Sequence, residues 1–101
     1  MAEYINQEAL EAKKILEKAL DTYGSQAQIT MVFEEMSELR KELCKYLRGK
    51  NDSETIEHVA EEIADVEIML EQMKLLFGID DDVADYREEK ILRLKWRLEE
   101  G

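Results

Sequence analysis

Apolar residues recur at alternating steps of three and four along much of the chain, which is the spacing of one buried stripe on an α-helix. The clearest stripe lies between Ser53 and Phe77, in a run without Gly or Pro. Its members are Ile56, Val59, Ile63, Val66, Leu70, Met73 and Phe77. A second stripe, between Ser25 and Arg48, consists of Val32, Met36, Leu39, Leu43 and Leu47. These runs predict two long helices that pack with their apolar stripes together.

Glycines separate four helical patterns. Gly24, Gly49 and Gly78 each follow such a pattern, at the place where a helix often ends in a left-handed residue. The predicted helices cover residues 5–23, 25–48, 53–77 and 82–98. The short connection at 49–52 predicts that the second and third helices are antiparallel neighbours. We therefore expect an all-α fold: a single domain, residues 1–101, forming a four-helix bundle-like protomer.

Polar residues at the starts of these helices suggest how they are capped. Ser25 with Gln28 fits a capping box for the second helix. Asp52 or Ser53 is the expected N-cap of the third. Three aspartates at 80–82 precede the fourth helix, where capping and the helix dipole account for them better than Ca²⁺ does.

Composition narrows the classes of function. The net charge of −11 argues against binding to a nucleic acid polymer or an anionic membrane. It does not exclude a nucleotide substrate, because a bound divalent cation would reverse the sign of the local charge. No apolar run approaches the length of a membrane span, and the acidic start of the chain does not resemble a signal peptide, so we expect a cytoplasmic protein. Cys44 is the one cysteine, which excludes an internal disulfide.

Two pairs of acids lie beside the apolar stripes in mid-helix. Glu35 and Glu38 are three positions apart on the second helix, and Glu62 and Asp65 are three apart on the third. Such spacing puts each pair on one face, and antiparallel packing would bring all four carboxylates together. Hard cations such as Mg²⁺ and Mn²⁺ prefer oxygen ligands of this kind. The alternative is a solvated acidic surface in a chain with 25 acidic residues.

Apolar residues off the main stripes of the first and fourth helices predict an obligate oligomer, because they exceed what one four-helix core absorbs. They are Leu10, Ile15, Leu20, Leu92 and Trp96. The fourth helix is also the one basic segment of the chain, and it carries Lys90 and Arg93. His58 lies one turn before Glu62, where we expect a partly exposed side chain.

The two acidic motifs in order, Glu34-Glu35-Met36-Ser37-Glu38-Leu39 and then Glu61-Glu62-Ile63-Ala64-Asp65-Val66, resemble the MazG-type all-α nucleoside triphosphate pyrophosphohydrolases. The resemblance covers roughly residues 25–98. It implies a helical bundle that forms a homodimer or homotetramer. It also implies that Mg²⁺, with Mn²⁺ as a substitute, is held by the four acids Glu35, Glu38, Glu62 and Asp65.

The same resemblance implies cleavage of a nucleoside triphosphate between its α- and β-phosphates, which yields a nucleoside monophosphate and pyrophosphate. We expect Glu38 to position or deprotonate the attacking water, and Lys90 or Arg93 to meet phosphate oxygens. Many relatives place a Lys and an Asn in this basic stretch; Lys90 fits, but residues 85–101 contain no Asn. A non-catalytic helical module for protein–protein interaction is the alternative function.

Overall fold

The computed structural model describes residues 2–101, with side chains from Asn6 onward, and all of its regular structure is helical. The four helices are α1 (Ala2–Tyr23), α2 (Ser25–Leu47), α3 (Ser53–Phe77) and α4 (Asp80–Glu100). No strand occurs in residues 2–101, so the predicted all-α class is confirmed, and four helices are consistent with a bundle-like fold. The bounds of α3 are those predicted, whereas α1 and α4 are longer than predicted. None of these helices is both long enough and apolar enough to cross a membrane.

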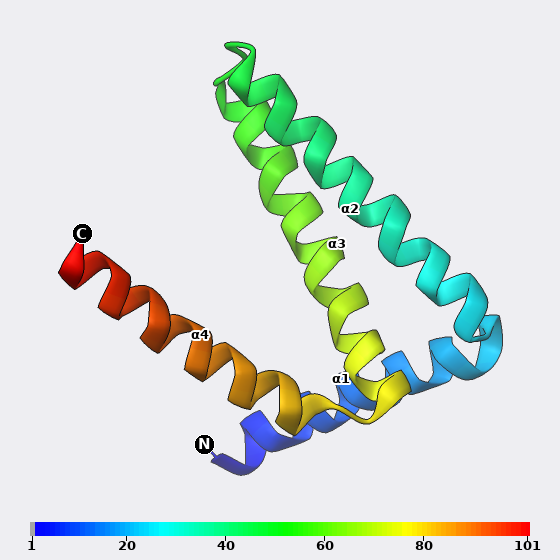
Figure 1. The fold of residues 1–101 in the computed structure, drawn as a ribbon. Coiled ribbons are helices and arrows are strands. Elements are labelled where there is room, and N and C mark those ends of the chain that lie inside the picture. The colour runs from blue at the N-terminus through cyan, green and yellow to red at the C-terminus, as the bar shows by residue number, and fades with distance from the viewer. Residues whose placement is uncertain (1) are drawn as a thin grey trace.

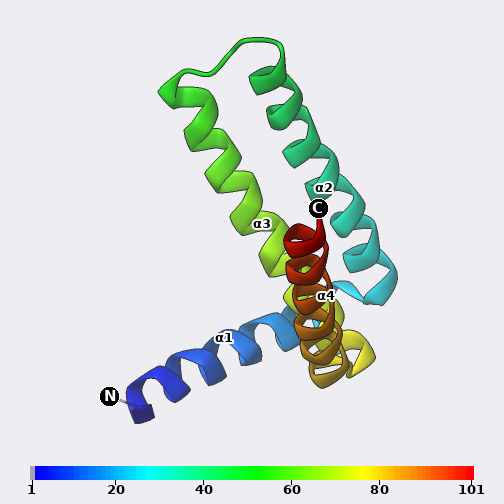
Figure 2. The same ribbon diagram turned by 60° about the vertical axis from the view of Figure 1, so that its left-hand side comes forward.

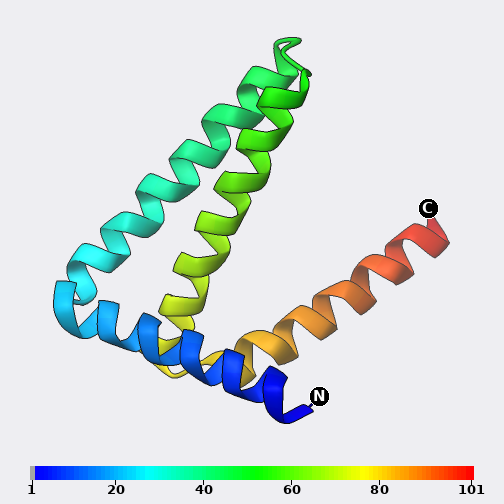
Figure 3. The ribbon, with the colours of Figure 1, turned by 180° about the vertical axis from the view of Figure 1, so that it is seen from behind.

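The helices α2 and α3 form an antiparallel hairpin that is the body of the molecule (Figure 1). Their 23 and 25 residues make each arm about 36 Å long at 1.5 Å per residue. Helix α1 crosses the open end of the hairpin, as the view in Figure 2 also shows, and packs on both arms. Helix α4 contacts only α3 and then projects away from it, which leaves a V between α4 and the hairpin (Figure 3).

Two of the predicted helix ends agree with the structure and one does not. Asp52 caps α3, because its side chain accepts a hydrogen bond from the Thr55 backbone N–H at 2.9 Å. Gly78 ends α3 in the left-handed region, at φ 64°, as glycine readily does. The predicted Ser25–Gln28 capping box is wrong, since Gly24 is the N-cap of α2 and no side chain bonds to it. The Gln28 amide instead reaches across the hairpin and donates to Gln72 Oε1 at 2.7 Å.

The contact between α2 and α3 is polar, and we call it the polar seam. It consists of buried and half-buried side chains at steps of three and four: Gln28, Val32, Glu35, Leu39 and Glu42 on α2, and Thr55, His58, Glu62, Asp65, Met69 and Gln72 on α3. Val32 and Met69 are the only buried apolar side chains from Asn6 onward. Val32 and Leu39 of the α2 stripe belong to the seam, and Val59, Val66 and Met73 of the α3 stripe are half-buried beside it, so the predicted packing of the two stripes holds only in part. On α3 the seam runs one position before the stripe.

The displaced stripes leave an apolar face on one side of the hairpin. One step along an α-helix turns the side chain by about 100°, and in an antiparallel pair a forward step on either helix leads to the same side. Arg40, which follows Leu39, lies on this side. The large apolar residues there are Phe33, Met36 and Leu43 on α2 and Ile56, Ile63 and Leu70 on α3, and Leu47 and Phe77 continue the two rows beyond the last seam positions. Their exposed fractions lie between 42% and 82%. The residues that precede seam positions form an acidic side opposite, with Glu34, Glu38, Glu54 and Glu61, all exposed.

Candidate metal centre

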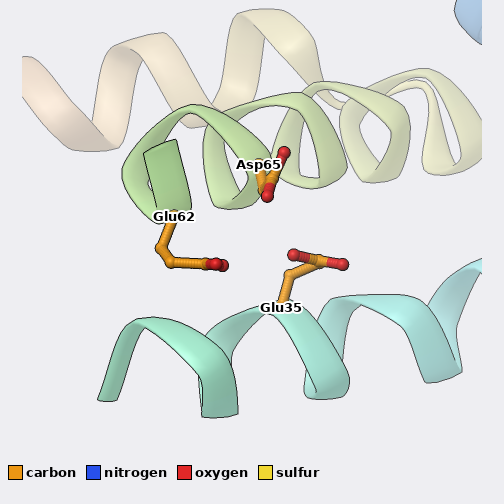
Figure 4. A group of neighbouring side chains, drawn as sticks. All are labelled: Glu35, Glu62 and Asp65. Carbon is orange, nitrogen blue, oxygen red and sulfur yellow. The ribbon is translucent and has the colours of Figure 1, made fainter. Parts of the chain in front are cut away.

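Three of the four predicted acids converge in the middle of the polar seam. Glu35 extends from α2 and meets Glu62 and Asp65 from α3, and the three carboxylates point toward one another across the gap (Figure 4). One oxygen of each lies within 4.8 Å of the others. All three side chains are half-buried. They meet because the three-residue spacing on α3 presents both of its acids to the same turn of α2.

No positive side chain from Asn6 onward neutralises this cluster. Among the side chains that the structure describes, none of the basic residues forms an ion pair with Glu35, Glu62 or Asp65. Glu62 Oε2 is buried and has no hydrogen-bond partner there. A carboxylate oxygen removed from water without a partner is unfavourable, and a cation bound to it would remove that penalty.

The pKa values of two cluster members are raised, because their carboxylates are partly buried near other negative charges. Partial burial raises the pKa of Glu35 above its ordinary value of 4.5, and the nearby charges of Asp65 and Glu62 raise it further. Partial burial likewise raises the pKa of Glu62, followed by the charges of Asp65 and Glu38. The donor set is three hard oxygens with no internal counter-charge, so its chemistry fits Mg²⁺ or Mn²⁺.

Glu38 lies at the edge of this cluster and outside the group of three. Its side chain is exposed on the acidic side, and it borders a shallow depression with Glu34 and Glu35. Its charge nevertheless raises the pKa of both Glu35 and Glu62, so it lies near the other carboxylates. An exposed carboxylate at the edge of the cluster is better placed to act on a water molecule beside a bound cation than to serve as one of the converging ligands.

The structure does not bring the two predicted phosphate-binding residues to the cluster. Lys90 and Arg93 lie on the exposed part of α4, which contacts α3 only and has no contact with α2. Arg93 instead approaches Glu89 one turn earlier on its own helix, at 3.6 Å. Within one chain, the basic segment and the acidic cluster are therefore separate features.

Glu42 is a seam residue that the sequence prediction missed. It is 6% exposed, and its Oε2 accepts from Lys45 Nζ at 2.9 Å while its Oε1 lies 3.3 Å from His58 Nδ1. The hydrogen bond from Lys45 is the main cause that lowers the pKa of Glu42, with the Lys45 charge and His58 adding to it against the effect of burial. The seam spacing from Gln28 onward, in steps of four and three, was the signal that could have identified this residue.

A larger groove, with a volume of about 760 Å³, lies between α1, α3 and α4. Its lining is mostly apolar and includes Ile15, Leu16 and Val83, with Lys74 and Arg87 as its basic members. It contains none of the cluster acids.

Comparisons with protein-family models, with curated proteins and with solved structures found no match to this chain.

Proposed function

We propose that this protein is a Mg²⁺-dependent nucleoside triphosphate pyrophosphohydrolase, which cleaves between the α- and β-phosphates and releases a nucleoside monophosphate and pyrophosphate. The observation that carries the proposal is the group of three carboxylates, Glu35, Glu62 and Asp65, which converge without any cationic partner among the described side chains. The order of the two acidic motifs, which resembles that of the MazG type, supports the choice of substrate class.

Each residue of the site has a separate role in the proposed reaction. Glu35, Glu62 and Asp65 hold the cation, and Glu38 at the exposed edge positions water or accepts its proton. Mg²⁺ supplies neutralisation of phosphate charge and makes water more acidic. Within one chain, α4 does not reach α2. Lys90 and Arg93 on α4 of a neighbouring copy therefore contact the phosphate oxygens of a substrate bound at this cluster. A homodimer or homotetramer and a cytoplasmic location belong to the same proposal.

An activity assay tests this directly. Pyrophosphate release is measured for a panel of standard and modified nucleoside triphosphates, with and without Mg²⁺. We expect release that requires Mg²⁺ and that is lost in Glu62→Gln. Glu61→Gln is the matched control, because Glu61 is the adjacent acid, is exposed and lies outside the group of three.

A binding measurement separates failure of the metal site from failure of the substrate choice. A ligand that binds only the folded state at about 100 times its Kd contributes about 2.7 kcal/mol to stability. Each kcal/mol raises the Tm of a domain of this size by about 4–8 °C. Millimolar Mg²⁺ should therefore raise the Tm of the wild type but not that of Glu62→Gln.

The second candidate is a non-catalytic helical interaction module, which the exposed apolar residues of the hairpin favour. No pyrophosphate release from any member of the panel, together with a Tm that ignores Mg²⁺, would leave this candidate in place of the enzyme.

A further inference from the structure

His58 is the one member of the polar seam that can carry a positive charge. It lies on α3 one turn before Glu62, a rise of about 6 Å at 1.5 Å per residue. Its side chain is 45% exposed, whereas the side chain of Glu42 beside it is 8% exposed. The imidazole ring therefore lies between the buried seam and solvent, next to the group of three carboxylates.

Glu42 brings two nitrogen groups together at this place. Its Oε2 accepts a hydrogen bond from Lys45 Nζ at 2.9 Å. Its Oε1 is buried, lies 3.3 Å from His58 Nδ1, and has no hydrogen-bond partner among the described side chains. A buried carboxylate oxygen without a donor is unfavourable. Hydrogen bonds of an active site that are long in the free protein often shorten when the substrate binds. The bond that Glu42 Oε1 lacks therefore indicates that a ligand completes this arrangement.

The chemistry of the ring indicates which ligand that is. The two nitrogens of imidazole lie on opposite sides of the ring, so with Nδ1 beside Glu42 the other nitrogen, Nε2, is turned away from it. An anionic acceptor at Nε2 favours the form of His58 in which both nitrogens carry hydrogen, and this form gives Glu42 Oε1 its donor. Lys45 has three N–H donors and gives one to Glu42, so it has others for the same anion. Phosphate oxygens suit both donors.

The distance to the three carboxylates matches a chain of phosphates. Glu42 lies near enough to them that its charge adds to the rise in the pKa of Glu62, which partial burial mainly causes. One helical turn from Glu62 to His58 is a length that the phosphate chain of a nucleoside triphosphate spans. The exposed acids Glu38 and Glu61 on this side of the hairpin repel such a chain, so donors at its far end are needed besides the cation.

We propose that His58 and Lys45 bind the β- and γ-phosphates of the substrate, the part that leaves as pyrophosphate, and that Glu42 is the residue that positions them. The inference rests on the proposed function, because the cation held by Glu35, Glu62 and Asp65 is what places the α-phosphate. The phosphate chain then lies along the polar seam, from the three carboxylates toward the loop that joins α2 to α3. These donors belong to the same chain as the cation ligands.

Binding of inorganic pyrophosphate tests the inference without hydrolysis. Isothermal titration calorimetry measures its Kd for the full chain in excess Mg²⁺, for the wild type, His58→Gln and Lys45→Gln. Each variant loses a hydrogen bond between charged groups, so we expect Kd to rise at least about 10-fold. Lys41→Gln is the matched control, because Lys41 lies one turn before Lys45 on α2 and is exposed. Its Kd should change less than about 2-fold.

Thermal melts separate phosphate binding from a purely structural bridge between the helices. Mg²⁺ alone should raise the Tm of His58→Gln as much as that of the wild type, since the three cation ligands remain. A structural bridge predicts a lower Tm for His58→Gln and an unchanged Kd for pyrophosphate in the folded protein. If Lys45→Gln does not fold, His58→Gln decides the question, because its side chain is half-exposed.

The outcomes distinguish this inference from the proposed function. Hydrolysis by the wild type, together with equal pyrophosphate affinities for all three variants, would overturn the inference and leave the enzyme in place. A wild type that does not bind pyrophosphate would also overturn the inference. Pyrophosphate binding that depends on His58 and Lys45, in a protein that hydrolyses no member of the nucleotide panel, would retain the phosphate site and overturn the proposed hydrolysis.

Discussion

Glu42 Oε1 lies 3.3 Å from His58 Nδ1, and this contact joins the C-terminal half of α2 to the first turns of α3. Lys45 completes the arrangement from the next turn of α2, with Nζ 2.9 Å from the other carboxylate oxygen. The buried carboxylate of Glu42 thus accepts one hydrogen bond, from Lys45, and its other oxygen lies beside His58 without a hydrogen-bond partner. The same seam, farther along, holds carboxylates that have no such donors.

We expect Glu42→Gln to destabilise the protein at neutral pH. The pKa of Glu42 is lowered below 4.5, so its charged form stabilises the folded state above that pH, and this contribution is lost as the pH falls through the folded value. Urea denaturation at a series of pH values should show the deficit of the variant shrinking as the pH falls below about 4.5. A deficit that stays constant down to pH 3 would mean that shape, and not charge, makes Glu42 important.

Glu62→Gln should have the opposite effect in metal-free protein. The substitution keeps the shape of the side chain and removes one of several like charges, so the variant should melt higher than the wild type in EDTA. Mg²⁺ should shrink or reverse this advantage, because only the wild type has the full ligand set, and hydrolysis should be nearly abolished. A variant that is less stable than the wild type in EDTA would show that Glu62 has a favourable partner in the protein.

The pH profile of Glu35→Gln in EDTA provides an independent check on the cluster. The pKa of Glu35 is raised above 4.5, so the penalty for its charge is absent below that pH and grows as the pH rises through the folded value. The variant should therefore match the wild type near pH 4 and become the more stable of the two toward pH 7. Equal stability across this range would argue that the cluster charges are fully screened by solvent.

The buried Gln28–Gln72 pair should behave as a coupled unit. These side chains are 6% and 4% exposed, and one hydrogen bond of 2.7 Å joins them. Gln28→Met or Gln72→Met alone leaves an amide buried without its partner, which costs about 1–3 kcal/mol. The double variant should recover most of that loss, because neither polar group remains. A double-mutant cycle measures this coupling, and additive losses would contradict it.

The sequence predicted the elements and the acids of the cluster better than it predicted which sides of the helices meet. Helix ends follow from local signals such as Asp52 and Gly78, and both were correct. The convergence of Glu35, Glu62 and Asp65 follows from helical spacing in an antiparallel hairpin. Ser25 and Gln28 gave a valid local signal, yet the long-range bond to Gln72 prevailed over it.

The seam was not predictable from periodicity alone. On α3, the row from Thr55 to Gln72 has the same steps of three and four as the apolar stripe that follows it by one position. Hydrophobicity favours the stripe as the inner row, and in a monomer with one core that choice is sound. Here the polar row joins α2 to α3 within the chain. Large members of the α3 stripe such as Ile56, Ile63 and Leu70 remain 42–49% exposed, which the periodicity of one helix does not predict.

The polar seam also has a consequence for how the protein reaches its native state. From Asn6 onward, Val32 and Met69 are the only fully buried apolar side chains, so a single chain gains less from collapse than a compact domain of this size does. In the proposed homodimer or homotetramer, further apolar burial becomes available only when chains meet. Refolding from denaturant should accordingly be second order, with a half-time that shortens in proportion as the protein concentration is raised. Stopped-flow circular dichroism over a hundredfold range of concentration would measure this dependence, and a rate independent of concentration would show that the hairpin folds first and by itself.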